Sequence, residues 1–224
     1  MRLQREHVVD VAIAQLDGAG LDALTMRKLA AELGVQAGAL YWHFGSKQAL
    51  LDAMADRFLE GLVADLPAGS WDEQLSAVAW RLREALLSHR DGARVMAGTY
   101  VAEPNTLLVG NTAVEILQAA GLAPDRAGWT AVAAMHYVLG HTIEEQAQIE
   151  LIKRGAWEPK LVVDGIENKI AATAFAADPA ERFRYGLELL LDGIRQQLAP
   201  PASTARSRTA SRGAGATRTR RNSR

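Results

Sequence analysis

The chain has 224 residues, 49% of them hydrophobic, with a formal net charge of −1 and no cysteine. This composition is typical of a globular protein with a buried core, and it excludes disulfides, thiolate nucleophiles and cysteine-ligated metals. No apolar run approaches the ~18 residues of a membrane span, and the N-terminus has no apolar signal core, so we expect a cytoplasmic protein with no membrane partner.

Apolar residues recur at helical spacing from the N-terminus onward, and abundant Ala and Leu favour helix over strand. A first helix is predicted over residues 3–17. Thr25 can cap a second helix, and residues 36–43 form a short third helix. These helices make up an N-terminal domain, residues 1–46, which a further helix over 47–65 connects to the rest of the chain.

The larger part of the chain, residues 47–198, is predicted to be a second helical domain. A capping-box pattern begins at Ser70, and Asp178 followed by Pro179 is a strong helix start. Its further helices are expected over 70–88, 91–98, 103–120, 125–150, 164–176 and 178–198. No alternating strand pattern is found, so the predicted fold class is all-α.

The last segment, residues 199–224, differs from the body in charge and composition. It holds seven arginines and no acid, which leaves 18 basic against 26 acidic side chains in residues 1–198, a net charge of −8. Because it is rich in small and polar residues and has no apolar periodicity, we predict a disordered, arginine-rich tail. Such a tail could add affinity for nucleic acid or simply aid solubility, and both interpretations stay open.

Residues 25–44 have the pattern of a helix-turn-helix, in which two short helices are joined by a turn containing Gly34. The second helix of such a unit enters the major groove, where Gln36 could bond an adenine edge and Ala37 could meet a thymine methyl. Arg27 could reach a guanine or a phosphate. Other groups that could donate hydrogen bonds to phosphate oxygens are Thr25, Tyr41, His43 and Lys47.

Two runs in this region resemble the DNA-binding domain of the TetR family: Leu-Thr-Met-Arg-Lys-Leu-Ala-Ala-Glu-Leu-Gly-Val, which begins at Leu24, and Leu-Tyr-Trp-His-Phe-Gly-Ser-Lys-Gln-Ala-Leu-Leu-Asp-Ala, which begins at Leu40. The resemblance implies an N-terminal helix-turn-helix domain and a C-terminal ligand-binding and dimerisation domain. It implies a homodimeric repressor that binds palindromic double-stranded operator DNA and is released by a small organic inducer. It places Arg27, Gln36 and Ala37 at the bases, and it places at the DNA backbone or groove Thr25, Ala39, Tyr41, His43 and Lys47.

Residues 86–99 and 139–146 are similar to the ligand domain of the tetracycline-repressor class of this family. That class holds its drug as a magnesium chelate, with a histidine ligand just before a Gly-Thr pair, and Met96 stands at this place here. A thioether is a poor ligand for a hard cation, so we expect no metal, no other cofactor, and an apolar or aromatic inducer. The candidate ligand contacts are Trp80, Leu82, Met96, Thr99, Tyr100, His136 and Glu144. The resemblance also implies a dimer seam on the helices over 125–150 and 179–198.

Several alternatives stay beside this interpretation. Phosphate-binding loops, nucleophile elbows and zinc motifs are absent from the sequence, so we expect no enzyme. The chain could be a helical adaptor without DNA binding, with Tyr41 and Trp42 in a core, or a metal-tetracycline-responsive repressor. Met96, Trp80 and His136 could be ordinary core residues. Residues 1–47 hold five basic and five acidic side chains, so non-specific DNA affinity should be weak and salt-sensitive.

Overall fold

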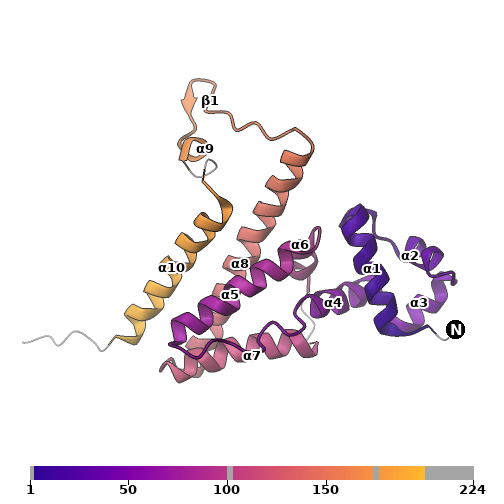
Figure 1. Cartoon of the computed structure of the whole chain (residues 1–224), viewed down its shortest axis with the longest axis horizontal. Coiled ribbons are helices and arrows are strands. Elements are labelled where there is room, and N and C mark those ends of the chain that lie inside the picture. Colours follow the sequence, from indigo (N-terminus) through magenta and orange to yellow (C-terminus); the bar gives the residue numbers. More distant parts are fainter. Residues whose placement is uncertain (1–2, 100–102, 174–176, 200–224) are drawn as a thin grey trace, which may run out of the picture.

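The computed structural model describes residues 3–99, 103–173 and 177–199, and most of these residues are helical, as the sequence predicts. The N-terminal helices form a head at one side of the molecule, and the longer helices form the body (Figure 1). The helices are α1 (Arg5–Ala19), α2 (Met26–Glu32), α3 (Ala37–Phe44), α4 (Lys47–Phe58), α5 (Trp71–Leu87), α6 (Gly92–Ala97), α7 (Pro104–Ala119), α8 (Pro124–Lys153), α9 (Lys169–Thr173) and α10 (Pro179–Leu198), with a 3-10 turn at Leu21–Ala23. Within the described part of the chain, no helix is long and apolar enough to cross a membrane.

Local capping sets the helix starts of the head. The Thr25 hydroxyl accepts a hydrogen bond from the Lys28 backbone N–H at 3.2 Å, and the Ser46 hydroxyl accepts one from the Ala49 N–H at 3.0 Å. Each cap satisfies an amide that the helix itself leaves unpaired, which is why these residues begin α2 and α4. Gly45, with φ of +69°, makes the sharp turn between α3 and α4.

The body is a helical bundle in which α5, α7 and α8 pack against one another and α10 packs against α8. The capping box at Ser70 and Glu73 begins α5, as predicted. α4 runs from the head into the body, where it contacts α6 and α7. It is therefore the helix through which the two parts of the molecule are joined.

Two segments differ from the sequence prediction. The helix expected over 47–65 ends at Phe58, because Gly61 has a left-handed φ of +71° and the chain turns there. Part of the helix expected over 164–176 is a small antiparallel hairpin of β1 (Val162–Val163) and β2 (Ile166–Glu167), with Val163 opposite Ile166. The Asp-Gly pair in its turn has positive φ at both residues, the geometry that a two-residue hairpin requires. The tail predicted over 199–224 lies, apart from its first residue, outside the described residues.

Candidate DNA-reading surface and ligand cavity

α3 buries one face in the head and presents the other to solvent. Leu40 and Phe44, one helical turn apart, lie in the core, whereas Tyr41 is exposed and Trp42 has 85% of its surface exposed. The interpretation of a plain hairpin with both aromatics in its core is therefore wrong. An exposed short helix that follows a capped partner has the geometry that major-groove reading needs.

All eight predicted DNA contacts are at least partly exposed in the structure. Thr25, Arg27, Gln36 and Tyr41 are exposed, and Ala37, Ala39, His43 and Lys47 are half-buried. The side chain of Gln36 makes no capping bond although it precedes α3, so its amide is available to a base. The His43 carbonyl accepts a hydrogen bond from Arg5 of α1 at 3.3 Å, which holds the end of α3 against the head.

The acidic residues of the head are largely engaged elsewhere. Asp10 pairs with Arg57 of α4 at 2.8 Å, Asp22 pairs with Arg94 of α6 at 3.0 Å, and Glu32 accepts a hydrogen bond from Gln15. Asp17 accepts from the Arg90 backbone N–H at 3.0 Å. The negative charges of Asp10 and Asp22 are therefore paired with arginines of α4 and α6, and Asp17 and Glu32 hydrogen-bond to neighbouring groups. This weakens the electrostatic repulsion between these acids and DNA phosphates at α3.

Trp42 is a candidate contact that the sequence prediction left out of the site. It lies at the middle of α3, and its ring meets the His43 ring edge-on with centroids 5.9 Å apart. The signal was present in the helical period, because Leu40 and Phe44 point inward and the residue midway between them must point outward.

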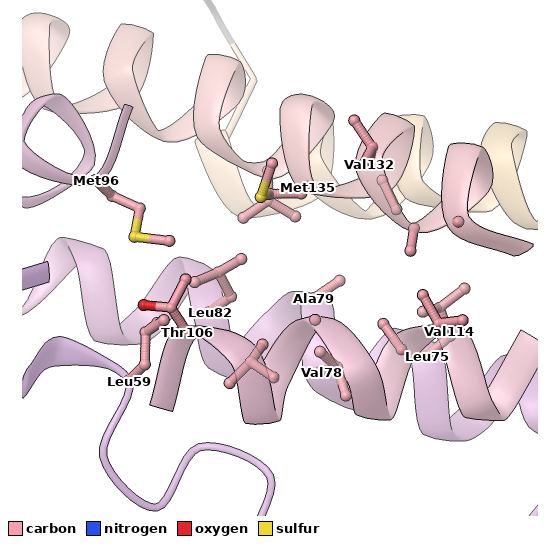
Figure 2. Close-up of a pocket in the computed structure, with 17 residues that line it drawn as sticks. Leu59, Leu75, Val78, Ala79, Leu82, Met96, Thr106, Val114, Val132 and Met135 are labelled. Carbon is pink, nitrogen blue, oxygen red and sulfur yellow. The ribbon is translucent and has the colours of Figure 1, made fainter. Parts of the chain in front are cut away.

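A partly open cavity of about 270 Å³ lies between α5, α7 and α8 (Figure 2). Leu82 and Val109 line it from α5 and α7, and Met135 lines it from α8. Leu59, just after α4, and Met96 of α6 close the end nearest the head. Among the described residues, the side chains of the wall are hydrocarbon and thioether except for the hydroxyl of Thr106, so the cavity suits an apolar guest.

Of the predicted ligand contacts that the structure describes, Leu82 and Met96 line this cavity and the others do not. Trp80 packs edge-on against Phe183 of α10 with ring centroids 4.7 Å apart, and the Thr99 hydroxyl donates to the Val95 carbonyl at 3.1 Å. His136 and Glu144 lie on the exposed face of α8, so the interpretation of His136 as a core residue is wrong. Tyr100 lies outside the described residues. Contacts that the prediction missed include Leu59, Thr106 and Met135.

A buried ion pair joins α5 and α8 outside the cavity wall. Arg83 of α5 donates to both carboxylate oxygens of Glu145 on α8, at 2.9 and 2.6 Å, and both side chains are buried. His141 lies beside this pair, and burial lowers the pKa of its imidazole. Because the pair neutralises itself, α5 and α8 can pack closely without bringing a net charge to the cavity wall.

The described residues that line the cavity do not fit a magnesium chelate. A hydrated magnesium ion needs oxygen ligands, and the one hydroxyl of the wall already donates to the carboxylate of Asp56 at 3.2 Å. In the described ranges, no group of three His, Asp or Glu side chains is placed to hold a metal.

Comparison with known proteins identifies both parts of the chain. Residues 8–54 match the model of the bacterial regulatory proteins of the tetR family, and residues 63–198 match that of the tetracyclin repressor-like C-terminal domain. The chain is 44% identical over 149 residues to the tetracycline repressor protein class G of Vibrio anguillarum, covering 65% of this chain and 70% of that protein.

Two similar solved structures contain a ligand or DNA. A TetR variant from Acinetobacter baumannii AYE in complex with minocycline has a TM-score of 0.71 and 36% identity, covering 89% of this chain and 100% of that one. BioQ with its double-stranded DNA operator has a TM-score of 0.64 and 31% identity, covering 87% of this chain and 99% of that one.

Proposed function

Because this chain belongs to the TetR family of bacterial regulators, we propose that α3 reads operator DNA from both protomers of a dimer, and that an apolar, metal-free inducer fills the cavity and releases the DNA. Members of this family are ligand-responsive transcriptional repressors rather than enzymes. The observation that carries the proposal is the position of Leu59. It directly follows the helix that leads from the head, and it lies in the cavity wall.

The exposed face of α3 supports the reading half of the proposal. Arg27, Gln36 and Ala37 would approach base edges, where each good side-chain pair discriminates by about 1–3 kcal/mol. The remaining predicted contacts, together with Trp42, would fix the position of the head on the phosphates and sugars. Phosphate contacts give affinity that falls with salt, and base contacts give the preference for one operator.

The dimer seam is proposed on the outward faces of α8 and α10. Trp129 of α8 is 63% exposed and Tyr185 of α10 is 69% exposed, and Leu189 lies one turn further along α10. The same faces carry Gly140 and Gly193, where helices can approach closely. Exposed apolar patches of this kind mark protein interfaces, and two helices from each protomer would form a four-helix bundle.

Fluorescence anisotropy with labelled DNA from the intergenic region beside the gene tests the reading half. The wild-type protein should bind this DNA more tightly than a scrambled sequence, and Arg27→Ala or Gln36→Ala should weaken specific binding by about 1–3 kcal/mol. Lys160→Ala, which removes an exposed cation of the body, is the matched control and should leave specific binding unchanged. Equal affinity for both DNAs at low salt would refute the proposal.

The inducer half is tested with N-phenyl-1-naphthylamine, an uncharged aromatic dye whose fluorescence rises in apolar surroundings. The dye should bind the protein and release the operator equally well with magnesium and with a chelator. Tetracycline with magnesium should release it poorly, because the cavity offers neither cation ligands nor polar partners for the drug. Release by tetracycline that requires magnesium would instead support the metal-dependent alternative.

A further inference from the structure

We infer that Asp56 transmits occupancy of the cavity to the reading head, through its hydrogen bonds with the first turn of α7. This inference rests on the proposed function, since it concerns how the inducer cavity governs DNA binding. The contact between the Asp56 carboxylate and residues 105–106, called here the Asp56 contact, joins a residue of the cavity wall to the helix that leads from α3.

One end of the Asp56 contact is set by three hydrogen bonds. Oδ1 of Asp56 accepts from the backbone N–H of Thr106 at 2.9 Å and from the Thr106 hydroxyl at 3.2 Å. Oδ2 accepts from the side-chain amide of Asn105 at 2.9 Å. The amides of the first turn of α7 also favour a carboxylate electrostatically. Both carboxylate oxygens are therefore held by α7.

Thr106 is also part of the cavity wall, beside Leu59 at the end nearest Met96 (Figure 2). Its hydroxyl is occupied by Asp56, so a guest in this part of the cavity meets the rest of the side chain. A ligand shifts a conformational equilibrium only by binding one state better than another. A guest that needs the space beside Leu59 binds best when Thr106 has moved outward, and Thr106 cannot move without Asp56 unless its two bonds to the carboxylate break.

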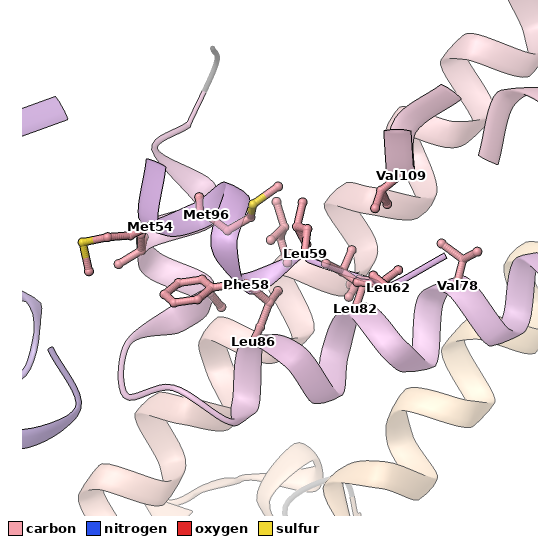
Figure 3. Close-up of a cluster of buried hydrophobic side chains, with 14 of the residues drawn as sticks. Met54, Phe58, Leu59, Leu62, Val78, Leu82, Leu86, Met96 and Val109 are labelled. Carbon is pink, nitrogen blue, oxygen red and sulfur yellow. The ribbon is translucent and has the colours of Figure 1, made fainter. Parts of the chain in front are cut away.

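The other end of the Asp56 contact leads to the head. Arg57, the next residue of α4, donates to Asp10 of α1 at 2.8 Å, so neighbouring positions of α4 bind the body and the head. Phe58 and Leu59 then anchor the end of α4 among Leu82, Leu86 and Met96 (Figure 3). α4 begins at Lys47, only three residues after the end of α3. A displacement of Asp56 is thus carried along one continuous helix to the DNA-reading surface.

The test measures the coupling between dye and operator. In the wild type, operator DNA should weaken binding of N-phenyl-1-naphthylamine at least about 10-fold, and by linkage the dye should weaken operator binding equally. The coupling ratio is the dissociation constant of the dye with operator divided by that without it. Asp56→Ala removes all three bonds, and this coupling ratio should fall below about 2-fold while the dye and the operator each still bind. Asn105→Ala removes one bond and should give an intermediate ratio. Asn111→Ala, an exposed amide further along α7, is the matched control and should keep the wild-type ratio.

The possible outcomes separate the two proposals. Asp56→Ala protein with a wild-type circular dichroism spectrum is folded. If such a protein keeps the wild-type coupling between dye and operator, the inference is overturned and the proposed function still stands. If Asp56→Ala does not fold, Asn105→Ala decides, because it leaves the carboxylate and the Thr106 bonds in place; an unchanged ratio then overturns the inference. A wild-type protein that binds neither operator nor dye would refute the proposed function itself.

Discussion

Two of the contacts that tie the head and α4 to the body differ in what lies behind them. One joins the end of α1 and the following turn to the α5–α6 turn: Asp17 accepts from the Arg90 N–H, and Asp91 accepts from the Leu21 N–H at 2.8 Å. We call this the turn contact; it also includes the Asp22–Arg94 ion pair. The other is the Asp56 contact, which rests on the first turn of α7 beside the cavity.

Behind the turn contact the body is clamped. The buried amide of Gln146 on α8 accepts from the Ala93 N–H at 3.1 Å and donates to the Leu86 and His89 carbonyls at 2.9 and 2.8 Å. The ring of His89 also stacks on Phe58 with centroids 4.3 Å apart. If the proposed coupling moves the Asp56 contact while the turn contact stays in place, the head rotates about the turn contact. The turn contact is thus the expected pivot.

The largest effect is expected from removing the clamp. Gln146→Leu leaves one N–H and two carbonyls of the α5–α6 turn without their buried partner, which should lower the free energy of unfolding by about 3 kcal/mol. Urea denaturation measures this loss. The matched control is Gln118→Leu, at an exposed position of α7, which should change it little. Equal effects of the two substitutions would mean that the turn is not clamped.

A smaller loss is expected from Gly20→Ala. Gly20 has φ of +82°, and a Cβ there would lie 3.0 Å from Oδ2 of Asp91 and 3.2 Å from Nε of Arg90. Strain at such a position costs about 1–3 kcal/mol, so both the melting temperature and operator affinity should fall. Gly18→Ala, two residues earlier in α1, meets nothing within 4 Å and should be neutral or slightly stabilising. Loss of stability in both variants alike would exclude the close approach as the cause.

Removal of the exposed ion pair should matter less. The Arg94 side chain is 42% exposed, and its partner Asp22 is more exposed still. Arg94→Gln removes this pair together with the Arg94–Asp91 pair at 3.1 Å, so it should lower the melting temperature only slightly, and added salt should shrink the difference from wild type. Thermal melts at low and high salt measure it. A large, salt-independent loss would show that Arg94 has a packing role in the turn contact.

The smallest effect is expected from acid. The hydrogen bond from Arg94 holds the pKa of the Asp22 carboxyl below its usual 3.8, so the ionised form stabilises the folded state above that pH. This contribution should be lost as the pH falls below 3.8 through the lowered pKa. Asp22→Asn should remove it from the pH dependence of the melting temperature. The part due to Asp72 should remain, because the Ser70 hydroxyl and Arg195 lower the pKa of that carboxyl to about 2. If the melting temperature of Asp22→Asn depends on pH below 3.8 as that of the wild type does, Asp22 does not make this contribution.

The parts of the fold that follow from local chemistry could be predicted from the sequence. Thr25, Ser46, Ser70 and Asp178 each begin a helix because a side-chain oxygen near the start meets an unpaired amide, and no distant residue is needed. The end of α4 and the β1–β2 hairpin were missed. Gly61 inside an apolar pattern and strands of only two residues give weak periodic signals, although the Asp-Gly pair was a usable turn signal.

The two functional regions were predictable to different degrees. The reading surface lies on one short helix, so the helical period alone orients its side chains. The cavity wall comes from distant segments, and its α8 side depends on which face of a 30-residue helix turns inward. α8 carries apolar residues on both faces, with Val138 buried and Trp129 exposed, so the sequence pattern did not orient His136 or Glu144.

Thr106 carries the single side-chain hydroxyl among the described residues of the cavity wall, and its bond to Asp56 has a consequence for chemical selectivity. A wall without free donors or acceptors cannot reject a close analogue by leaving one of its own polar groups unpaired. It can discriminate only by size and by the number of buried methylenes, each worth roughly 0.8 kcal/mol. Potency across a homologous series of uncharged compounds should therefore rise step by step with chain length, until the volume of about 270 Å³ is filled. Such a sensor would report a lipophilic class of compounds rather than one molecule.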